Sequence, residues 1–263
     1  CVGSQPMWRK KLHEEIGYFD ETLTCAADWD FWLRIAQKYD LKRIPEYLGL
    51  YLRNEDGIEH SKQTHSYYER YLVGKRYGNP YISIVPVYEF VGNPLVSVII
   101  PVYNGEDYIQ EAIESVLIQN YRNFELIIIN DGSTDRSEEI IKSFEDEHIR
   151  YFHQENKGVS AAHNAGIRLA RGEFIIKLDV DDVMAIDNIS KSLEKFKTNP
   201  DADMVYCNDL LADSNGKPDR LLARKEFSDN NILIRDLFRC GYPVVAPRSA
   251  CMRKEVYEKI GRF

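Results

Sequence analysis

The chain has 263 residues, enough for one large domain or two small ones with a sizeable core. Its net charge of −8, without a basic stripe, argues against nucleic acid as a partner. Its apolar runs are too short to cross a membrane, and its N-terminus lacks the basic and then apolar order of a signal peptide.

The first region, residues 1–77, has the pattern of a largely helical segment. Apolar residues recur at the i, i+3, i+4, i+7 spacing of an amphipathic helix over 28–39. Residues 78–94 carry a Gly-Asn-Pro turn sequence at each end, so we expect a linker there.

From residue 95 to 263 the pattern alternates between strand and helix. We expect strands at 95–102, 124–129, 149–152, 173–178 and 203–207, and helices at 105–120, 135–145, 158–170 and 187–197. Asp135, three residues before Glu138, is expected to cap its helix in a capping box. This order predicts an α/β fold with a mostly parallel central sheet and helices on both faces.

The two ends of the chain resemble each other. Residues 6–19 align with 250–263, and Arg9 matches Arg253 at an offset of 253 − 9 = 244 residues. Glu14, Ile16, Gly17 and Phe19 also have identical partners at this offset. A period this long is that of a whole domain rather than of a solenoid repeat. A chance match of so short a segment is the alternative.

An acidic cluster follows the apolar strand expected at 173–178. Residues i and i+2 of an extended chain point the same way, so Asp179 and Asp181 converge and repel unless a cation lies between them. Mg²⁺ or Mn²⁺ prefers carboxylate and diphosphate oxygens and would neutralise a leaving nucleoside diphosphate. A solvated acidic loop is the alternative.

Two further polar positions follow the first two strands. Asp131 lies where ligands bind in such sheets and can accept a hydrogen bond from a base or a ribose, although Asp-Gly is also a common turn pair. Tyr103 can stack on a base, and the backbone beside Pro101 can accept a hydrogen bond. An aromatic residue at the edge of the core is the alternative for Tyr103.

Gly158 precedes the helix that carries His163. A glycine there exposes helix N–H groups to a phosphate, and His163 could contact a diphosphate on the next turn. A loop glycine and a surface histidine are the alternative.

Three residues of the first region are candidates for chemistry. Asp28 precedes the Trp-rich helix and could be a general base, although a helix-capping Asp is common. Asp30 is the rival candidate for the base. His60 could bind a metal, although a lone His in a polar loop usually has no function.

Together these segments resemble glycosyltransferase family 2, whose fold is GT-A. The family's nucleotide-binding half is matched in order at Val98–Asn104, Asn130–Asp135, Asn156–Gly158, Asn164–Gly166, Arg171–Glu173 and Leu178–Asp182. Its acceptor half is matched at Arg9-Lys10, Ile16–Asp20, Ala27–Arg34 and Tyr51–Arg53. The halves are in swapped order, so we expect a window across a tandem two-domain enzyme, in which the acceptor half of one copy precedes the nucleotide-binding half of the next.

The resemblance implies roles for individual residues. It assigns the nucleotide, typically a uridine nucleotide, to Pro101, Tyr103, Asn104, Glu106, Asp131, Gly158, His163 and Asp179. It assigns the metal to Asp181 and Asp179, and the catalytic base to Asp28.

The chain departs from the family at three positions. His163 stands where the family usually has Arg, which implies a weaker or pH-sensitive contact with the diphosphate. Ala27 replaces the Glu that commonly precedes the base. Arg53-Asn-Glu55 replaces an Arg-x-His motif, which leaves His60 as the substitute metal ligand.

The resemblance therefore implies a metal-dependent, inverting glycosyltransferase that moves a sugar from a UDP-sugar to a saccharide or lipid-linked acceptor, in bacterial polysaccharide or glycolipid synthesis. A non-catalytic, nucleotide-sugar-binding fragment of a tandem enzyme is the alternative. Nucleotidyl transfer is disfavoured because Val102–Glu106 is not a glycine- and lysine-rich loop. Residues 1–77 could complete the site in cis, or by exchange between two chains in a dimer.

The five cysteines are scattered along the chain. They form no CxxC pair, so neither a zinc site nor a disulfide framework is expected. We therefore expect residence in the reducing cytoplasm. Peripheral association at the inner face of the membrane is what the resemblance to glycosyltransferase family 2 implies.

Overall fold

The computed structural model describes residues 12–23, 26–39, 68–69, 71–73, 76, 92–212, 218–222 and 250–260. The chain divides into two compact units, Cys1–Ile84 and Val85–Phe263, and each is described by itself. Within the described ranges, no helix combines the length and the apolar character needed to cross a lipid bilayer.

The described part of the first unit is largely helical, as predicted. It contains α1 (Leu12–Ile16), α2 (Ala27–Ala36) and the helical residues 68–69, 71–73 and 76. Arg34 of α2 donates hydrogen bonds to the backbone oxygens of Ile16 (2.6 Å) and Tyr18 (2.7 Å). The Arg34 side chain therefore ties the segment after α1 to α2.

Both copies of the terminal repeat form a helix in the structure. Helix α1 ends at Ile16 and α10 (Lys254–Ile260) ends at Ile260, a separation of 260 − 16 = 244 residues. Gly17 follows α1 with a φ of +82°, a backbone conformation that favours glycine. Residues 12–16 and their equivalents at this offset, 256–260, are therefore helical in both segments.

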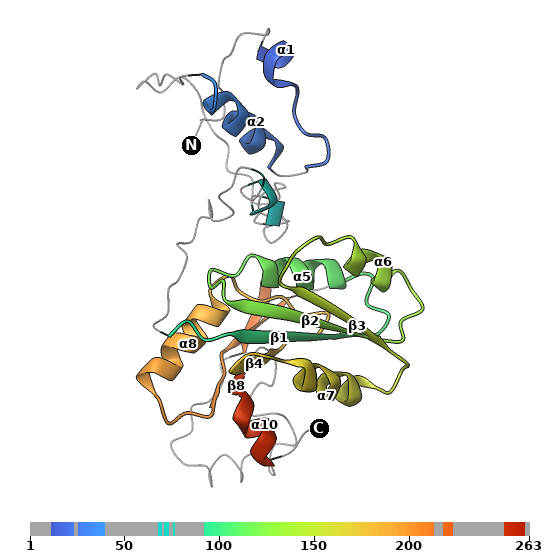
Figure 1. Ribbon diagram of the computed structural model, residues 1–263, viewed down its shortest axis with the longest axis vertical. Coiled ribbons are helices and arrows are strands. Elements are labelled where there is room, and N and C mark those ends of the chain that lie inside the picture. The colour runs from blue at the N-terminus through green and yellow to red at the C-terminus, as the bar shows by residue number, and fades with distance from the viewer. Residues whose placement is uncertain are drawn as a thin grey trace. The chain divides into compact units, whose positions relative to one another are not determined.

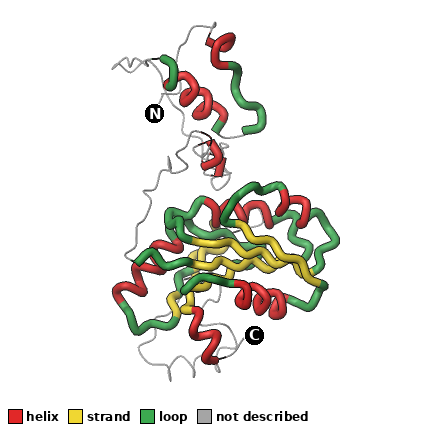
Figure 2. Tube along the Cα trace, in the orientation of Figure 1, coloured by secondary structure: helices red, strands yellow, loops and turns green. Residues whose placement is uncertain are grey.

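A six-stranded sheet forms the centre of the second unit (Figures 1 and 2). Its strands, in spatial order, are β3 (Ile149–Gln154), β2 (Phe124–Asp131), β1 (Val96–Val102), β4 (Phe174–Lys177), β8 (Cys251–Arg253) and β5 (Met204–Val205). Strands β3, β2, β1 and β4 are parallel, whereas β8 is antiparallel to both of its neighbours. A separate hairpin pairs β6 (Asp209–Ala212) with β7 (Pro218–Leu222). The mostly parallel sheet confirms the prediction.

Helices cover both faces of this sheet. Figure 1 shows α5 (Ile109–Leu117) and α6 (Ser137–Lys142) on one face, and α7 (Val159–Leu169) and α10 on the other. Helix α8 (Asn188–Thr198) follows β4 in the chain. A core cluster joins Ile99 and Ile127 of the sheet to Ala162 of α7 and Tyr257 of α10. A Cβ atom on Gly166 would lie 2.3 Å from Cγ2 of Ile99, so α7 depends on glycine for its close approach to β1.

Three local expectations differ from the structure. Helix α5 begins at Ile109 rather than at 105, because the preceding residues form a turn after β1. Strand β2 continues through Asp131, which pairs with Gln154 of β3. The capping box is wrong in its partners: Asp135 accepts from the Ser137 amide at 3.0 Å, and Glu138 pairs with Lys142.

Candidate active site

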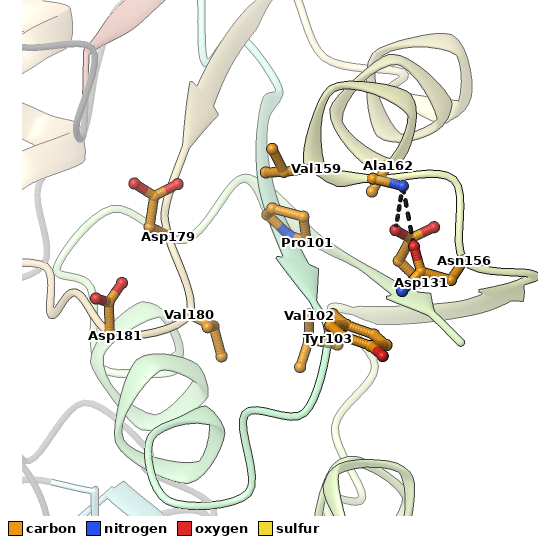
Figure 3. Close-up of a pocket in the computed structure, with 11 residues that line it drawn as sticks. Pro101, Val102, Tyr103, Asp131, Asn156, Val159, Ala162, Asp179, Val180 and Asp181 are labelled. Atoms are coloured by element: carbon orange, nitrogen blue, oxygen red, sulfur yellow. Dashed lines mark hydrogen bonds between the residues drawn. The ribbon is translucent and has the colours of Figure 1, made fainter. Parts of the chain in front are cut away.

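A cavity of about 370 Å³ lies at the carboxyl ends of β1, β2 and β4 (Figure 3). The chain runs outward from β1 to β2 and β3, and then returns to the other side of β1 as β4. Ligands of open α/β sheets bind at such a switch in strand order. The lining residues are Pro101, Val102, Tyr103, Asp131, Asn156, Gly158, Val159, Ala162, Asp179, Val180 and Asp181.

Asp131 forms one end of the cavity and is only 3% exposed. Its Oδ1 accepts hydrogen bonds from Gln154 Nε2 (2.6 Å) and the Lys157 amide (3.0 Å), and its Oδ2 accepts one from the Gly158 amide (2.8 Å). A carboxylate offers about four acceptor sites, so Asp131 can accept one more donor, at Oδ2. Asp131 therefore fixes the loop before α7 and can still bind a ligand N–H or O–H.

Two partly exposed side chains give the cavity apolar surface. Tyr103 follows β1 and is 52% exposed, and Val159 at the start of α7 is 59% exposed. Figure 3 shows Pro101, Val102 and Tyr103 between Asp131 on one side and Asp179 and Asp181 on the other. The ring of Tyr103 therefore lies between the Asp131 carboxylate at one end of the cavity and the carboxylates of Asp179 and Asp181 at the other.

Three carboxylates converge after β4. Oxygen atoms of Asp179, Asp181 and Asp182 all lie within 4.8 Å of one another. The Asp182 amide donates to the Asp179 carbonyl oxygen at 3.0 Å, which closes the turn that carries them. An all-oxygen set this close fits a hard divalent cation such as Mg²⁺ or Mn²⁺. The sequence reasoning named Asp179 and Asp181 as ligands but not Asp182, although its place beside Asp181 was a signal.

His163 lies beside the acidic cluster and is buried rather than on the surface, at 8% exposed. Its Nε2 is 3.9 Å from Oδ1 of Asp179. Burial, reinforced by the positive charge of Lys177, lowers the pKa of His163 to about 4. Burial also lowers the pKa of Lys177, although Asp179 opposes this change. At neutral pH the imidazole beside Asp179 is therefore uncharged.

Asn104 and Glu106 do not line the cavity; they join two neighbouring loops. Asn104 Oδ1 accepts from the Thr134 amide (2.8 Å), and Glu106 Oε2 accepts from the Arg136 amide (3.0 Å). In return, Asp135 Oδ2 accepts from the Glu106 amide at 2.9 Å. These bonds shape the loop after Tyr103, while the predicted contact of Asn104 and Glu106 with a nucleotide stays a prediction.

The structure describes the three candidate residues of the first unit, Asp28, Asp30 and His60, to different extents. Asp28 lies in the first turn of α2, and its side chain is not among those described. Asp30 is 1% exposed and accepts from Arg34 Nε and an Arg76 nitrogen, both at 2.9 Å. Both oxygens of Asp30 thus accept from arginine side chains, and its role as the rival base stays a prediction. His60 lies outside the described residues.

Sequence comparisons identify relatives of this chain. The family model named Glycosyl transferase family 2 matches residues 97–261. A protein of Rickettsia felis named an uncharacterized glycosyltransferase is 34% identical over 224 residues, which cover 72% of this chain and 37% of that protein. Glycosyltransferase GlyG of Streptococcus pneumoniae is 44% identical over 117 residues, 43% of this chain and 38% of that protein. The chain spans 37% to 54% of the length of the first curated relatives it matches.

A solved structure shares the fold. The crystal structure of Staphylococcus aureus TarS 1-349 in complex with UDP-GlcNAc is 21% identical in sequence and has a TM-score of 0.50. The match covers 62% of this chain and 46% of the TarS chain. This likeness of architecture agrees with the mostly parallel sheet and confirms the expected GT-A fold.

Proposed function

We propose that this chain, which belongs to glycosyltransferase family 2, binds a nucleotide-sugar donor in the cavity at the carboxyl ends of β1, β2 and β4, and that this donor is a UDP-sugar. The observation that carries the proposal is that one cavity joins a buried acceptor, Asp131, to Asp179 and Asp181, which belong to a cluster of three carboxylates. A nucleoside diphosphate has a hydrogen-bonding base at one end and a metal-binding diphosphate at the other, which matches this arrangement.

The base and ribose would lie at the Asp131 end of the cavity. The remaining acceptor site of Asp131 suits the N–H of a uracil ring, and the half-exposed ring of Tyr103 offers a stacking surface. The preference for uridine therefore depends on Asp131 and the backbone beside Pro101.

The diphosphate would lie toward Asp179, Asp181 and Asp182, which would hold Mg²⁺ or Mn²⁺. A divalent cation bound there supplies positive charge to the diphosphate as it leaves. His163 lies beside Asp179 and would contact the diphosphate as a neutral hydrogen-bonding group.

The proposed reaction is a single displacement with inversion at the anomeric carbon. A base, proposed as Asp28, takes a proton from an acceptor hydroxyl of a saccharide or lipid-linked glycan, and the oxygen forms the new glycosidic bond as the nucleoside diphosphate leaves. Polysaccharide or glycolipid synthesis at the cytoplasmic face of a bacterial membrane is the proposed setting.

Donor binding without transfer is the second candidate function. Among the residues that the structure describes, those that line the cavity lie between Pro101 and Asp181, within the second unit. The donor half can therefore bind its ligand whether or not residues 1–77 supply a base, in cis or from a second chain.

The test is incubation of the chain with a panel of UDP-sugars and Mn²⁺, with release of UDP measured in parallel with donor binding. Release that is lost in Asp28→Asn, while donor binding persists, supports the transferase. Binding without release, in the presence of candidate acceptors, supports the donor-binding alternative. A chain that neither binds nor releases UDP from any common donor contradicts the proposal.

A further inference from the structure

We infer that Ser115 and Gln119 are positioning residues that hold the acidic cluster in shape for its cation. Ser115 lies in α5 and Gln119 just after it, and we call this pair the α5 brace. Their exposed fractions are 0% and 1%, and neither side chain lines the cavity. The inference rests on the proposed function, since it concerns the same cation site.

The α5 brace holds the segment that follows the acidic cluster. Ser115 Oγ accepts a hydrogen bond from the Met184 amide at 3.1 Å. Gln119 Nε2 donates to the Ala185 carbonyl oxygen at 2.7 Å, and its Oε1 accepts from the Ile189 amide at 3.2 Å. The two side chains therefore bind three backbone groups, two in the loop after the acidic cluster and one in the first turn of α8. The amides of Met184 and Ile189 belong to buried residues, so their hydrogen bonds to the α5 brace fix this loop firmly.

The other side of the cluster is also fixed. The Leu178 amide donates to the Ile99 carbonyl oxygen at 3.0 Å, which anchors the chain just before the cluster. A Cβ atom on Gly105 would lie 2.7 Å from Cγ2 of Val180, so the loop after β1 is in close contact with the middle of the cluster. The chain is therefore held on both sides of the acidic residues. Strand β1 and the loop after it hold one side, and the α5 brace holds the other.

Such anchoring matters because like charges repel. Three carboxylates within 4.8 Å of one another favour spreading apart when no cation is present. A loop held at both ends keeps them together, so less free energy is spent on rearrangement when the cation binds. Loosening the α5 brace should therefore weaken cation binding more than it weakens binding of the nucleotide base.

The chain offers a matched control in Ser97. Ser115 and Ser97 are both 0% exposed, and each hydroxyl accepts from one backbone amide and donates to one oxygen. Ser97 Oγ accepts from the Gly172 amide at 2.9 Å and donates to Glu125 at 2.7 Å, at the amino end of β1. Ser115→Ala and Ser97→Ala therefore each remove one buried hydroxyl, with one accepted and one donated hydrogen bond, at opposite ends of the sheet.

The experiment measures Mn²⁺ binding in the presence of UDP by electron paramagnetic resonance, and UDP binding in EDTA by calorimetry, on the full chain. We expect Ser115→Ala to weaken Mn²⁺ binding about 10-fold, in the range found for residues that support metal ligands. Ser97→Ala should leave Mn²⁺ binding within about 2-fold of wild type, because it lies outside that support. UDP binding in EDTA should change little in either variant, since Asp131 and Tyr103 are untouched.

Gln119→Met is a second variant of the α5 brace. It takes the place of Ser115→Ala in the experiment if Ser115→Ala does not fold. The inference is overturned if the folded brace variants bind Mn²⁺ as tightly as wild type does. It is also overturned if Ser97→Ala weakens Mn²⁺ binding as much as the brace variants do. Failure of the wild type to bind Mn²⁺ with UDP overturns the proposed cation site itself, and the inference with it. The wild-type titration therefore separates the two failures.

Discussion

Asp131→Asn is the substitution that separates the two roles of Asp131, in folding and in nucleotide binding. The variant keeps one carbonyl oxygen but places an NH₂ group where the other carboxylate oxygen was. If the carbonyl takes the position of Oδ1, the new NH₂ faces the Gly158 amide, which in the wild type donates to Oδ2 at 2.8 Å, so that two donors face each other. The Gly158 N–H keeps its second acceptor, Asn156 Oδ1 at 3.2 Å, but loses its hydrogen bond to a charged acceptor, which contributes about 1.5–3 kcal/mol. We therefore expect a loss of about 2 kcal/mol in stability, or roughly 4 to 8 °C in Tm.

The loss in nucleotide affinity is a separate quantity. A hydrogen bond to a charged acceptor contributes about 1.5–3 kcal/mol, so losing the one to the base should weaken UDP binding about 10- to 150-fold. Asp135→Asn is the matched control, because Asp135 also accepts from two backbone amides, those of Ser137 (3.0 Å) and Glu106 (2.9 Å), but does not line the cavity.

Calorimetric titration with UDP, together with thermal unfolding of both variants, measures these quantities. Asp135→Asn should lose stability and keep its UDP affinity within about 3-fold, since its bonds only join two loops. The reasoning is refuted if Asp131→Asn, when folded, binds UDP as wild type does, or if the two variants lose affinity equally.

The remaining predictions concern the aromatic surface, the packing of α7 and the buried histidine. Tyr103→Ala should weaken UDP binding about 10-fold through lost stacking, whereas Tyr108→Ala, 56% exposed and outside the cavity, should not; equal affinities of the two variants would count against stacking. Gly166→Ala should lower the free energy of unfolding in urea by about 1–3 kcal/mol, because the new Cβ meets Ile99; an unchanged midpoint contradicts that close approach. The pKa of His163 is about 4 in the folded chain, against 6.5 ordinarily, so the folded state binds fewer protons between these values and loses stability as the pH falls through that window. This shift changes the free energy of unfolding by at most about 3 kcal/mol. Between pH 7 and pH 5, denaturant melts should show a smaller loss of stability for His163→Gln than for wild type. Equal losses in the two proteins would contradict the lowered pKa of His163.

Strands β1, β2 and β4 could be predicted from the sequence because their central residues are apolar on both faces. Strands β1 and β2 are buried along their whole length, so their Ile- and Val-rich runs are visible without any partner information. Strand β8 is different, since its three residues join the sheet between β4 and β5 through pairing across a long stretch of chain. No local pattern encodes such a pairing.

The site was predictable where it depends on strand ends and not where it depends on loop geometry. Asp131, Asp179 and Asp181 directly follow or end apolar runs, and the structure brings all three to one cavity. Asn156 lines the same cavity only because the loop before α7 folds back onto Asp131. The burial of His163 could not be predicted from the sequence either, because it depends on the packing of α7 against β1 and β2.

The central claim is that one cavity binds a uridine nucleotide and a divalent cation together. Its most direct test is calorimetric titration of the full chain with UDP, in Mn²⁺ and in EDTA, for wild type and Asp181→Asn. The account predicts that Mn²⁺ tightens UDP binding in wild type and that Asp181→Asn removes this dependence while it retains the weaker binding seen in EDTA. Absence of UDP binding, or wild-type binding that is the same with and without Mn²⁺, would contradict it.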